Sequence, residues 1–142
     1  MNVTFRKPQG TDDWHTLLDW IAADPEHREK DMKPDFFLTE GGLKLVLGNN
    51  RAPGLFLRLD PEANGTVRLH IQFGPDKITS AKTMLRGWPP FMDRVKASGK
   101  VSRLIFQSTS GTLIGFCKRC FGFSQVPGTN DYELLLTEEN NG

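Results

Sequence analysis

The sequence has 142 residues, of which 37% are hydrophobic and 25% charged, and its formal net charge at pH 7 is +1. This length suits one domain, residues 1–142, with a hydrophobic core of its own. So small a net charge gives no overall field that would draw the chain to nucleic acid or to an anionic membrane. No apolar run reaches the roughly 20 residues of a membrane span, and Met1–Lys7 lacks the apolar stretch of a signal peptide. Two cysteines do not make a disulfide scaffold, so we expect a cytoplasmic protein.

The first 35 residues predict a strand, a helix and a charged loop. Residues 2–7 alternate weakly and favour a short strand. Thr11 is expected to cap a helix whose buried stripe follows the spacing i, i+3, i+4 and i+7, as Trp14, Leu17, Leu18 and Ile21. The helix should end at Asp24-Pro25. Residues 25–35 are strongly charged and hold two prolines, which is typical of a surface loop that could contain a short helix.

Three strands in a row are predicted next, at residues 43–47, 55–59 and 66–73. Residues 48–50 and 60–65 separate them and are rich in glycine, asparagine, aspartate and proline, the residues that form tight turns. Connections as short as these favour an antiparallel meander.

The second half mixes helices with strands. Residues 78–98 predict a long helix that Pro89 and Pro90 should kink or split, because a proline inside a helix removes one hydrogen bond and clashes with the preceding turn. The segments that follow are predicted as a strand at 101–106, a short helix that ends near Gly122, a strand at 132–136 and a frayed tail at 137–142. The short helix is indicated by Leu113, Ile114, Phe116 and Cys117. The order is therefore β-α-(α)-β-β-β-α-β-α-β, a layered α/β domain.

Three segments follow one another near the end of the chain: Ile105-Phe106-Gln107-Ser108, then Leu113-Ile114-Gly115-Phe116-Cys117-Lys118-Arg119, then Phe121-Gly122-Phe123. This series resembles the end of the GNAT superfamily of N-acetyltransferases, which closes with a strand, a helix beside the cofactor, a Gly-Phe turn and a last strand. The resemblance implies a mixed, largely antiparallel sheet, splayed in the middle, with helices on both faces. It also implies acetyl transfer from acetyl-CoA to a small-molecule or peptide amine, with the acceptor recognised by the loops around 24–42 and 124–131.

The resemblance also places the cofactor at the turn between the strand 66–73 and the long helix. GNAT enzymes hold the pyrophosphate of acetyl-CoA there with a glycine-rich loop, whose backbone amides and helix N-terminus attract an anion. This chain has one glycine, a proline without an N–H group and an aspartate, Gly74-Pro75-Asp76. The residues expected to contact the cofactor are Phe73, Gly74, Lys77, Thr79 and Ser80.

His70 and Gln72 are the predicted catalytic residues, because they share one face of the strand 66–73 and could line the central cleft. A histidine with a pKa near neutrality can serve as a general base. The alternative is that Arg68, His70 and Gln72 form the solvent-exposed face of a half-covered strand. Tyr132, the one tyrosine of the sequence, is expected to pack rather than to act as an acid.

Three further patterns each have a structural explanation beside a functional one. Cys117 and Cys120 form a C-x-x-C, which is too few ligands for a zinc site and suits packing, so no metal site is expected. Trp88-Pro89-Pro90-Phe91 suits either a packed kink or a hydrophobic contact surface. The basic residues of the long helix and the next strand suit a solvated face or a phosphate contact.

Two functions from different classes follow. The first is an acyl-CoA-dependent N-acyltransferase. The second is a non-catalytic GNAT-like module for binding or assembly, of the kind found among phage-encoded and accessory proteins, which the altered phosphate loop favours. A homodimer could form if the last strand lies at a sheet edge.

Overall fold

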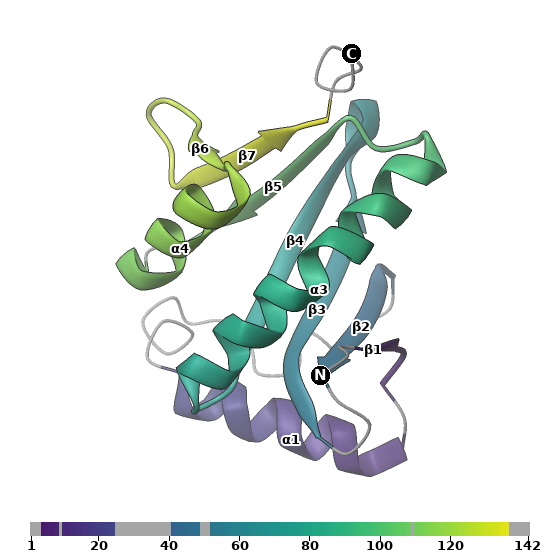
Figure 1. Ribbon diagram of the computed structural model, residues 1–142, viewed down its shortest axis with the longest axis vertical. Helices are drawn as coiled ribbons and strands as arrows, with labels where there is room; N and C mark the ends of the chain where they lie inside the picture. The colour runs from purple at the N-terminus through teal and green to yellow at the C-terminus, as the bar shows by residue number, and fades with distance from the viewer. Residues whose placement is uncertain (1–3, 9, 25–40, 49–51, 109, 137–142) are drawn as a thin grey trace. The chain divides into compact units, whose positions relative to one another are not determined.

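The computed structural model describes residues 4–8, 10–24, 41–48, 52–108 and 110–136. The elements follow in the order β1 (Thr4–Arg6), α1 (Gly10–Ala23), β2 (Leu43–Gly48), β3 (Pro53–Pro61), a 3-10 turn (Ala63–Gly65), β4 (Thr66–Phe73), α3 (Lys77–Ser98), β5 (Arg103–Gln107), α4 (Gly111–Phe121), β6 (Ser124–Gln125) and β7 (Asp131–Leu135) (Figure 1). The predicted loop at 25–35 and the predicted frayed tail at 137–142 lie outside the described residues. Among the helices that the structure describes, none has the length and apolarity that crossing a bilayer requires.

The described strands form one mixed sheet in the order β1-β2-β3-β4-β5-β7-β6. Neighbours are antiparallel in the pairs β1–β2, β5–β7 and β6–β7, whereas β4 runs parallel to β5. The parallel register joins Thr66–Arg68, the first three residues of β4, to Arg103–Ile105. The sheet confirms the predicted mixed α/β fold, and the adjacent places of β2, β3 and β4 confirm the predicted meander.

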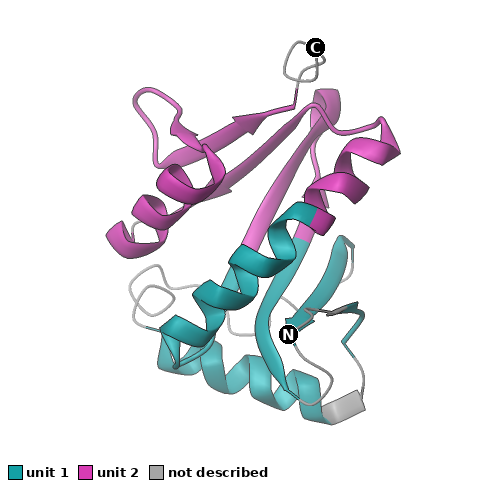
Figure 2. Cartoon of the chain, in the orientation of Figure 1, with its two compact units in different colours: residues 1–58, 71–89 teal, residues 59–70, 90–142 magenta. Residues whose placement is uncertain are grey.

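The chain forms two compact units, residues 1–58 with 71–89 and residues 59–70 with 90–142 (Figure 2). We call them unit 1 and unit 2. Strands β3 and β4 and helix α3 each contribute to both units. The expectation of one domain over residues 1–142 stays a prediction.

The core of unit 1 forms where α1 packs against β2 and β3. Leu17 and Ile21 of the predicted stripe are buried together with Val46 and Phe56. Trp14 and Trp20 are partly buried against this cluster, and the Trp20 ring meets Phe56 edge-on with 5.2 Å between ring centroids. The helical spacing read from the sequence therefore identified the buried face of α1.

The core of unit 2 is aromatic and lies along β5 and β7. Phe106 is 2% exposed and contacts Phe123 edge-on and Tyr132 in a stack, with ring centroids 5.1 and 5.5 Å apart. This packing confirms the structural role predicted for Tyr132. Gly122 ends α4 in the left-handed conformation, at φ 81°, which directs Phe123 into this core. The Gly-Phe pair thus works as a helix stop followed by a core residue.

The sequence predicts that Pro89 and Pro90 kink or split α3. The split is wrong, because residues 77–98 form one uninterrupted helix. The prolines leave the carbonyl groups of Leu85 and Arg86 without their usual helical donors. These four residues are all exposed, so water can satisfy the two carbonyls. The unit boundary nevertheless falls between the two prolines.

Smaller corrections concern the ends of elements. Helix α1 begins at Gly10, so Thr11 lies inside it and not at the cap, while β5 begins at Arg103 and not at 101. The two-residue strand β6 was not expected, since Ser124-Gln125 has no strand-like pattern. It pairs with Tyr132 and Glu133, so β7 lies between β5 and β6 and is not the edge strand that the homodimer hypothesis needed.

We predict that Gly54→Ala destabilises the fold, because β3 approaches α3 closely at this glycine. A Cβ at residue 54 would stand 2.9 Å from the Cβ of Thr83, a buried β-branched residue that has little freedom to move. Equilibrium denaturation should show a loss of about 1–3 kcal/mol, the usual cost of overpacking. Gly111→Ala is the control, because no atom lies within 4 Å of the added carbon. Equal stability of both variants would contradict the prediction.

Candidate functional site

Strand β4 carries both predicted catalytic residues, but they belong to different units. His70 is the last residue of β4 within unit 2, and Gln72 lies in the part of β4 that belongs to unit 1. We therefore describe the two surroundings separately.

Gln72 is fully buried, so the alternative in which it belongs to a solvent-exposed face is wrong for this residue. Its Nε2 donates to Asp24 Oδ2 at 3.0 Å and to the carbonyl oxygen of Phe73 at 2.9 Å. Because both neighbours are acceptors, the amide nitrogen has to point toward them. Its Oε1 is buried without a hydrogen-bond partner among the described residues. The side chain thus holds the end of α1 against the end of β4.

His70 is partly buried beside a carboxylate. Its Nε2 lies 3.2 Å from Asp60 Oδ2, and both side chains are about a quarter exposed. Asp60 comes from the end of β3, which the hairpin turn at Ala63–Gly65 brings back alongside β4. The carboxylate would stabilise an imidazolium at this place, which suits a histidine that accepts a proton.

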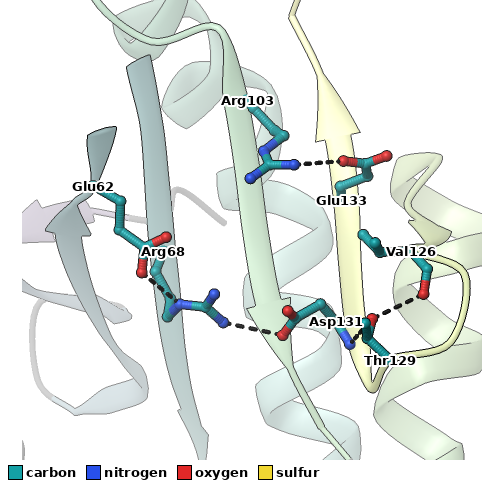
Figure 3. A network of polar contacts seen from close by, with 7 residues as sticks. All are labelled: Glu62, Arg68, Arg103, Val126, Thr129, Asp131 and Glu133. Carbon is teal, nitrogen blue, oxygen red and sulfur yellow. Dashed lines mark hydrogen bonds and ion pairs between the residues drawn. The ribbon is translucent and has the colours of Figure 1, made fainter. Parts of the chain in front are cut away.

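A polar network next to His70 links β4 to β7 (Figure 3). Arg68 donates from Nε to Glu62 at 2.8 Å and from a terminal nitrogen to Asp131 Oδ1 at 3.2 Å. Arg103 of β5 pairs in the same way with Glu133 of β7 at 3.0 Å. Arg103 and Glu133 join the neighbouring strands β5 and β7, and Arg68 of β4 reaches Asp131 of β7, so the network has a structural role in unit 2.

The same network fixes the turn between β6 and β7. The Thr129 hydroxyl donates to the carbonyl oxygen of Val126 at 2.8 Å and accepts from the amide of Asp131 at 3.0 Å. Gln125 closes the turn by donating to the carbonyl oxygen of Thr129. Most of the loop predicted to recognise an acceptor, 124–131, is therefore held by its own hydrogen bonds and by Arg68.

The turn from β4 into α3 is closed by the buried hydroxyl of Ser80. This hydroxyl accepts from the Gly74 amide at 2.8 Å and donates to the carbonyl oxygen of Gly54 at 2.7 Å. Ser80 is 1% exposed, and Gly74 is buried against Trp20, whose ring would lie 2.9 Å from a Cβ at position 74. Two of the residues predicted to contact a cofactor, Gly74 and Ser80, are therefore bonded to each other.

The remaining residues of the turn face solvent. Asp76 precedes the first residue of α3 and caps it, because its Oδ1 accepts from the Thr79 amide at 3.1 Å. The Thr79 hydroxyl donates to the other carboxylate oxygen at 2.8 Å. Lys77 is exposed and Phe73 half-buried. The turn thus brings the five predicted cofactor residues together, but Asp76 already occupies the donors of Thr79.

These contacts do not fit a pyrophosphate held by the backbone of this turn, as the resemblance to GNAT enzymes implied. The Gly74 amide is bonded to Ser80, Pro75 has no N–H group and the Thr79 amide is bonded to Asp76. Among the five residues predicted to contact the cofactor, Lys77 has a positively charged side chain, and this side chain is exposed to solvent.

Sequence reasoning missed the partners of the predicted residues. Asp24 and Asp60 meet Gln72 and His70 through tertiary contacts that no local pattern announces, although the predicted hairpin does bring 60 and 70 close together. Asp76 did carry a local signal, since an aspartate three residues before Thr79 at the start of a helix is typical of a cap.

We predict that Ellman's reagent labels one thiol per native chain at pH 8. Both cysteines are free, with Cys120 exposed and Cys117 fully buried. Burial, with a smaller contribution from Cys120, raises the pKa of Cys117 to about 12, so its reactive thiolate is scarce. Cys120→Ser should abolish native labelling and Cys117→Ser should leave it unchanged. Rapid labelling of both thiols without denaturant would contradict the packing role.

We predict that Gln72→Glu destabilises the protein more at pH 7 than at pH 5. The new carboxylate would stand where Nε2 now lies 3.0 Å from Asp24 Oδ2, so like charges would meet in a buried place. Burial and repulsion would raise the pKa of the new carboxyl above its unfolded value, so the penalty grows as the pH rises above that value. Thermal unfolding measured at both pH values tests this. Gln125→Glu is the same change at an exposed position and gives up the hydrogen bond to Thr129. Its cost should be nearly equal at both pH values, because an exposed glutamate is already ionised at pH 5.

Comparison with known proteins finds similarity in structure only. No protein-family model matches the sequence, and no curated protein matches it significantly. The ribosomal-protein-S18-alanine N-acetyltransferase from Escherichia coli superposes with a TM-score of 0.65 at 14% identity, over 95% of this chain and 94% of that one. A GNAT-family acetyltransferase from Staphylococcus aureus Mu50 gives 0.70 at 13% identity, over 95% and 99%. The aminoglycoside acetyltransferase AAC(6')-Ib in complex with coenzyme A gives 0.66 at 10% identity, over 94% and 95%.

These structural similarities extend over nearly the whole of each chain. The sequence identities are too low to assign the substrate or the mechanism of any of these proteins to this chain. The chain therefore has the fold of the GNAT acetyltransferases.

Proposed function

We propose that this protein transfers an acyl group from an acyl-CoA, acetyl-CoA in the first instance, to an amine. The observation that carries the proposal is the fold, which is shared end to end with acetyltransferases, one of them solved with coenzyme A bound. Fold alone does not fix a reaction, so the proposal also draws on the side chains of β4.

His70 is proposed as the proton acceptor. An amine attacks a carbonyl only in its neutral form and has to lose a proton as the new bond forms, so a base beside it accelerates the reaction. The carboxylate of Asp60, 3.2 Å from Nε2, would stabilise the imidazolium that results. Gln72 is proposed as a positioning residue, because its hydrogen bonds to Asp24 and Phe73 hold the end of β4 in place.

For the cofactor, the exposed ammonium group of Lys77 is the proposed contact for the charged nucleotide end. Phe73 and Gly74 are proposed to line the part of the same cofactor site that lies at the end of β4. The hydroxyls of Thr79 and Ser80 would have to leave their present partners to contribute. Both thiols of the chain are free, which suits the reducing cytoplasm in which we propose that the protein works.

A second candidate function is a GNAT-fold module that binds a partner without catalysis. One observation favours it, namely that amide donors of the β4–α3 turn are engaged within the protein itself. The same fold serves proteins of many functions, so the loss of a ligand site does not conflict with the retained architecture.

The proposal predicts release of CoA when the protein meets acetyl-CoA and an accepted amine. A panel of amino acids, polyamines, aminoglycosides and peptide N-termini would be screened, with free CoA measured by chromatography. His70→Gln should lower kcat by about 10²- to 10⁴-fold, the usual contribution of a general base, with KM little changed. His15→Gln, an exposed change on α1, should leave kcat unchanged.

Two results would each contradict part of this proposal. One is wild-type protein that neither turns over any amine nor binds acetyl-CoA at millimolar concentration in calorimetry, which would favour the binding module. The other is full activity in His70→Gln, which would remove His70 from the mechanism and leave the reaction class standing.

A further inference from the structure

The N-terminus of α3 already carries a negative charge that belongs to the protein. Helix α3 has 22 residues, and the first amides of a helix of this length attract anions because they lack helical acceptors. The carboxylate of Asp76 stands at this place. Both of its oxygens accept hydrogen bonds from Thr79, one from the amide at 3.1 Å and one from the hydroxyl at 2.8 Å.

The pKa of Asp76 shows how closely this carboxylate is bound to the helix. The Thr79 hydroxyl lowers that pKa most, followed by the Thr79 amide, with smaller contributions from the Ile78 amide and from the charge of Lys82. The carboxylate is therefore fully ionised at neutral pH, where phosphate groups are also negatively charged.

Several other groups of the turn are bonded inside the protein. The amide of Gly74 donates to the Ser80 hydroxyl, and that hydroxyl donates onward to Gly54 in a site with 1% exposure. The amide of Ser80 donates to the carbonyl oxygen of Asp76. Pro75 has no N–H group. A phosphate that approached this turn would find the Gly74, Thr79 and Ser80 amides bonded and a negative charge beside them.

We infer that the carboxylate of Asp76 is a built-in substitute for a ligand phosphate, which keeps the N-terminus of α3 from binding the pyrophosphate of an acyl-CoA. The inference rests on the proposed function only for the choice of ligand. Any acyl-CoA that the protein binds is then held by contacts to its acyl and pantetheine parts and by Lys77, and Asp76 limits its affinity.

Two variants separate the charge of Asp76 from its hydrogen bonds. Asp76→Asn removes the negative charge and keeps a side-chain oxygen that can cap the helix, since asparagine caps about as well as aspartate. Asp76→Ala removes the charge and also frees the Thr79 amide. Asp93→Asn is the matched control, because it makes the same charge change at an exposed position of the same helix.

Calorimetry would use three probes: acetyl-CoA, acetyl-pantetheine, which lacks the nucleotide and its pyrophosphate, and inorganic pyrophosphate. We expect the affinity for acetyl-CoA and for pyrophosphate to rise at least about tenfold in Asp76→Ala, as a repulsive charge is removed and a charge-assisted hydrogen bond becomes available. Asp76→Asn should gain less. The affinity for acetyl-pantetheine should not change, and Asp93→Asn should match the wild type with every probe.

The cap itself is checked without any ligand. The folded-state pKa of Asp76 is depressed, so its stabilising effect is present above the unfolded pKa of about 3.9 and is lost as the pH falls through the folded value. Asp76→Ala should therefore melt at a lower temperature than the wild type at pH 7, and the difference should shrink at pH 3. A cooperative transition in this scan also shows that the variant is folded.

The outcomes keep this inference apart from the proposed function. A wild type that binds no probe, beside an Asp76→Ala variant that gains pyrophosphate and acetyl-CoA, would support the role of Asp76 and oppose the transferase. Wild-type binding of acetyl-CoA that Asp76→Ala leaves unchanged would overturn the role of Asp76 and leave the transferase intact. Folded variants that gain no affinity for pyrophosphate would overturn it as well.

Discussion

The buried hydroxyl of Ser80 is the contact on which the β4–α3 turn depends. It accepts from the amide of Gly74 and donates to the carbonyl oxygen of Gly54, so one side chain joins β3, the turn and the first turn of α3. At 1% exposure none of these groups could be satisfied by bulk water, and loss of the hydroxyl would leave two backbone groups unpaired. The ring of Trp20 packs against Gly74 and leaves no room for a Cβ at position 74. The path of the turn is therefore fixed by the protein's own contacts.

A turn held in this way offers a ligand few backbone N–H groups that still lack an acceptor. Asp76 completes it by bonding the Thr79 amide with a charge that the helix N-terminus stabilises. The fold of the GNAT acetyltransferases is thus combined with a β4–α3 turn whose amides of Gly74, Thr79 and Ser80 are bonded within the protein. His70 and Asp60 belong to unit 2, and the turn belongs to unit 1, so the proposed catalytic and cofactor-binding roles rest on different residues and can be tested separately.

Local pattern predicted the regular elements well because their causes are local. Strand β4 was predicted at 66–73, where the structure has it, since strict alternation and flanking turn residues mark a strand. The stripe Leu17 and Ile21 was predicted for the same kind of reason. The expectation of a split α3 was wrong, because the cost of Pro89 and Pro90 depends on whether water reaches the freed carbonyls. Strand β6 was missed because its two residues are ordered by pairing with Tyr132 and Glu133, which lie beyond a turn.

The sequence by itself determined the order of the elements apart from β6, the buried stripe of α1 and the turn residues, because each depends on neighbours within a few positions. It also placed His70 and Gln72 on one face of β4. Only the tertiary structure decided that Gln72 is buried against Asp24 and that His70 faces Asp60. It also decided that Ser80 is bonded to Gly54 and not open to a ligand. These partners lie between 10 and 48 positions apart along the chain, and burial and hydrogen bonding at such separations are set by packing, which no local pattern encodes.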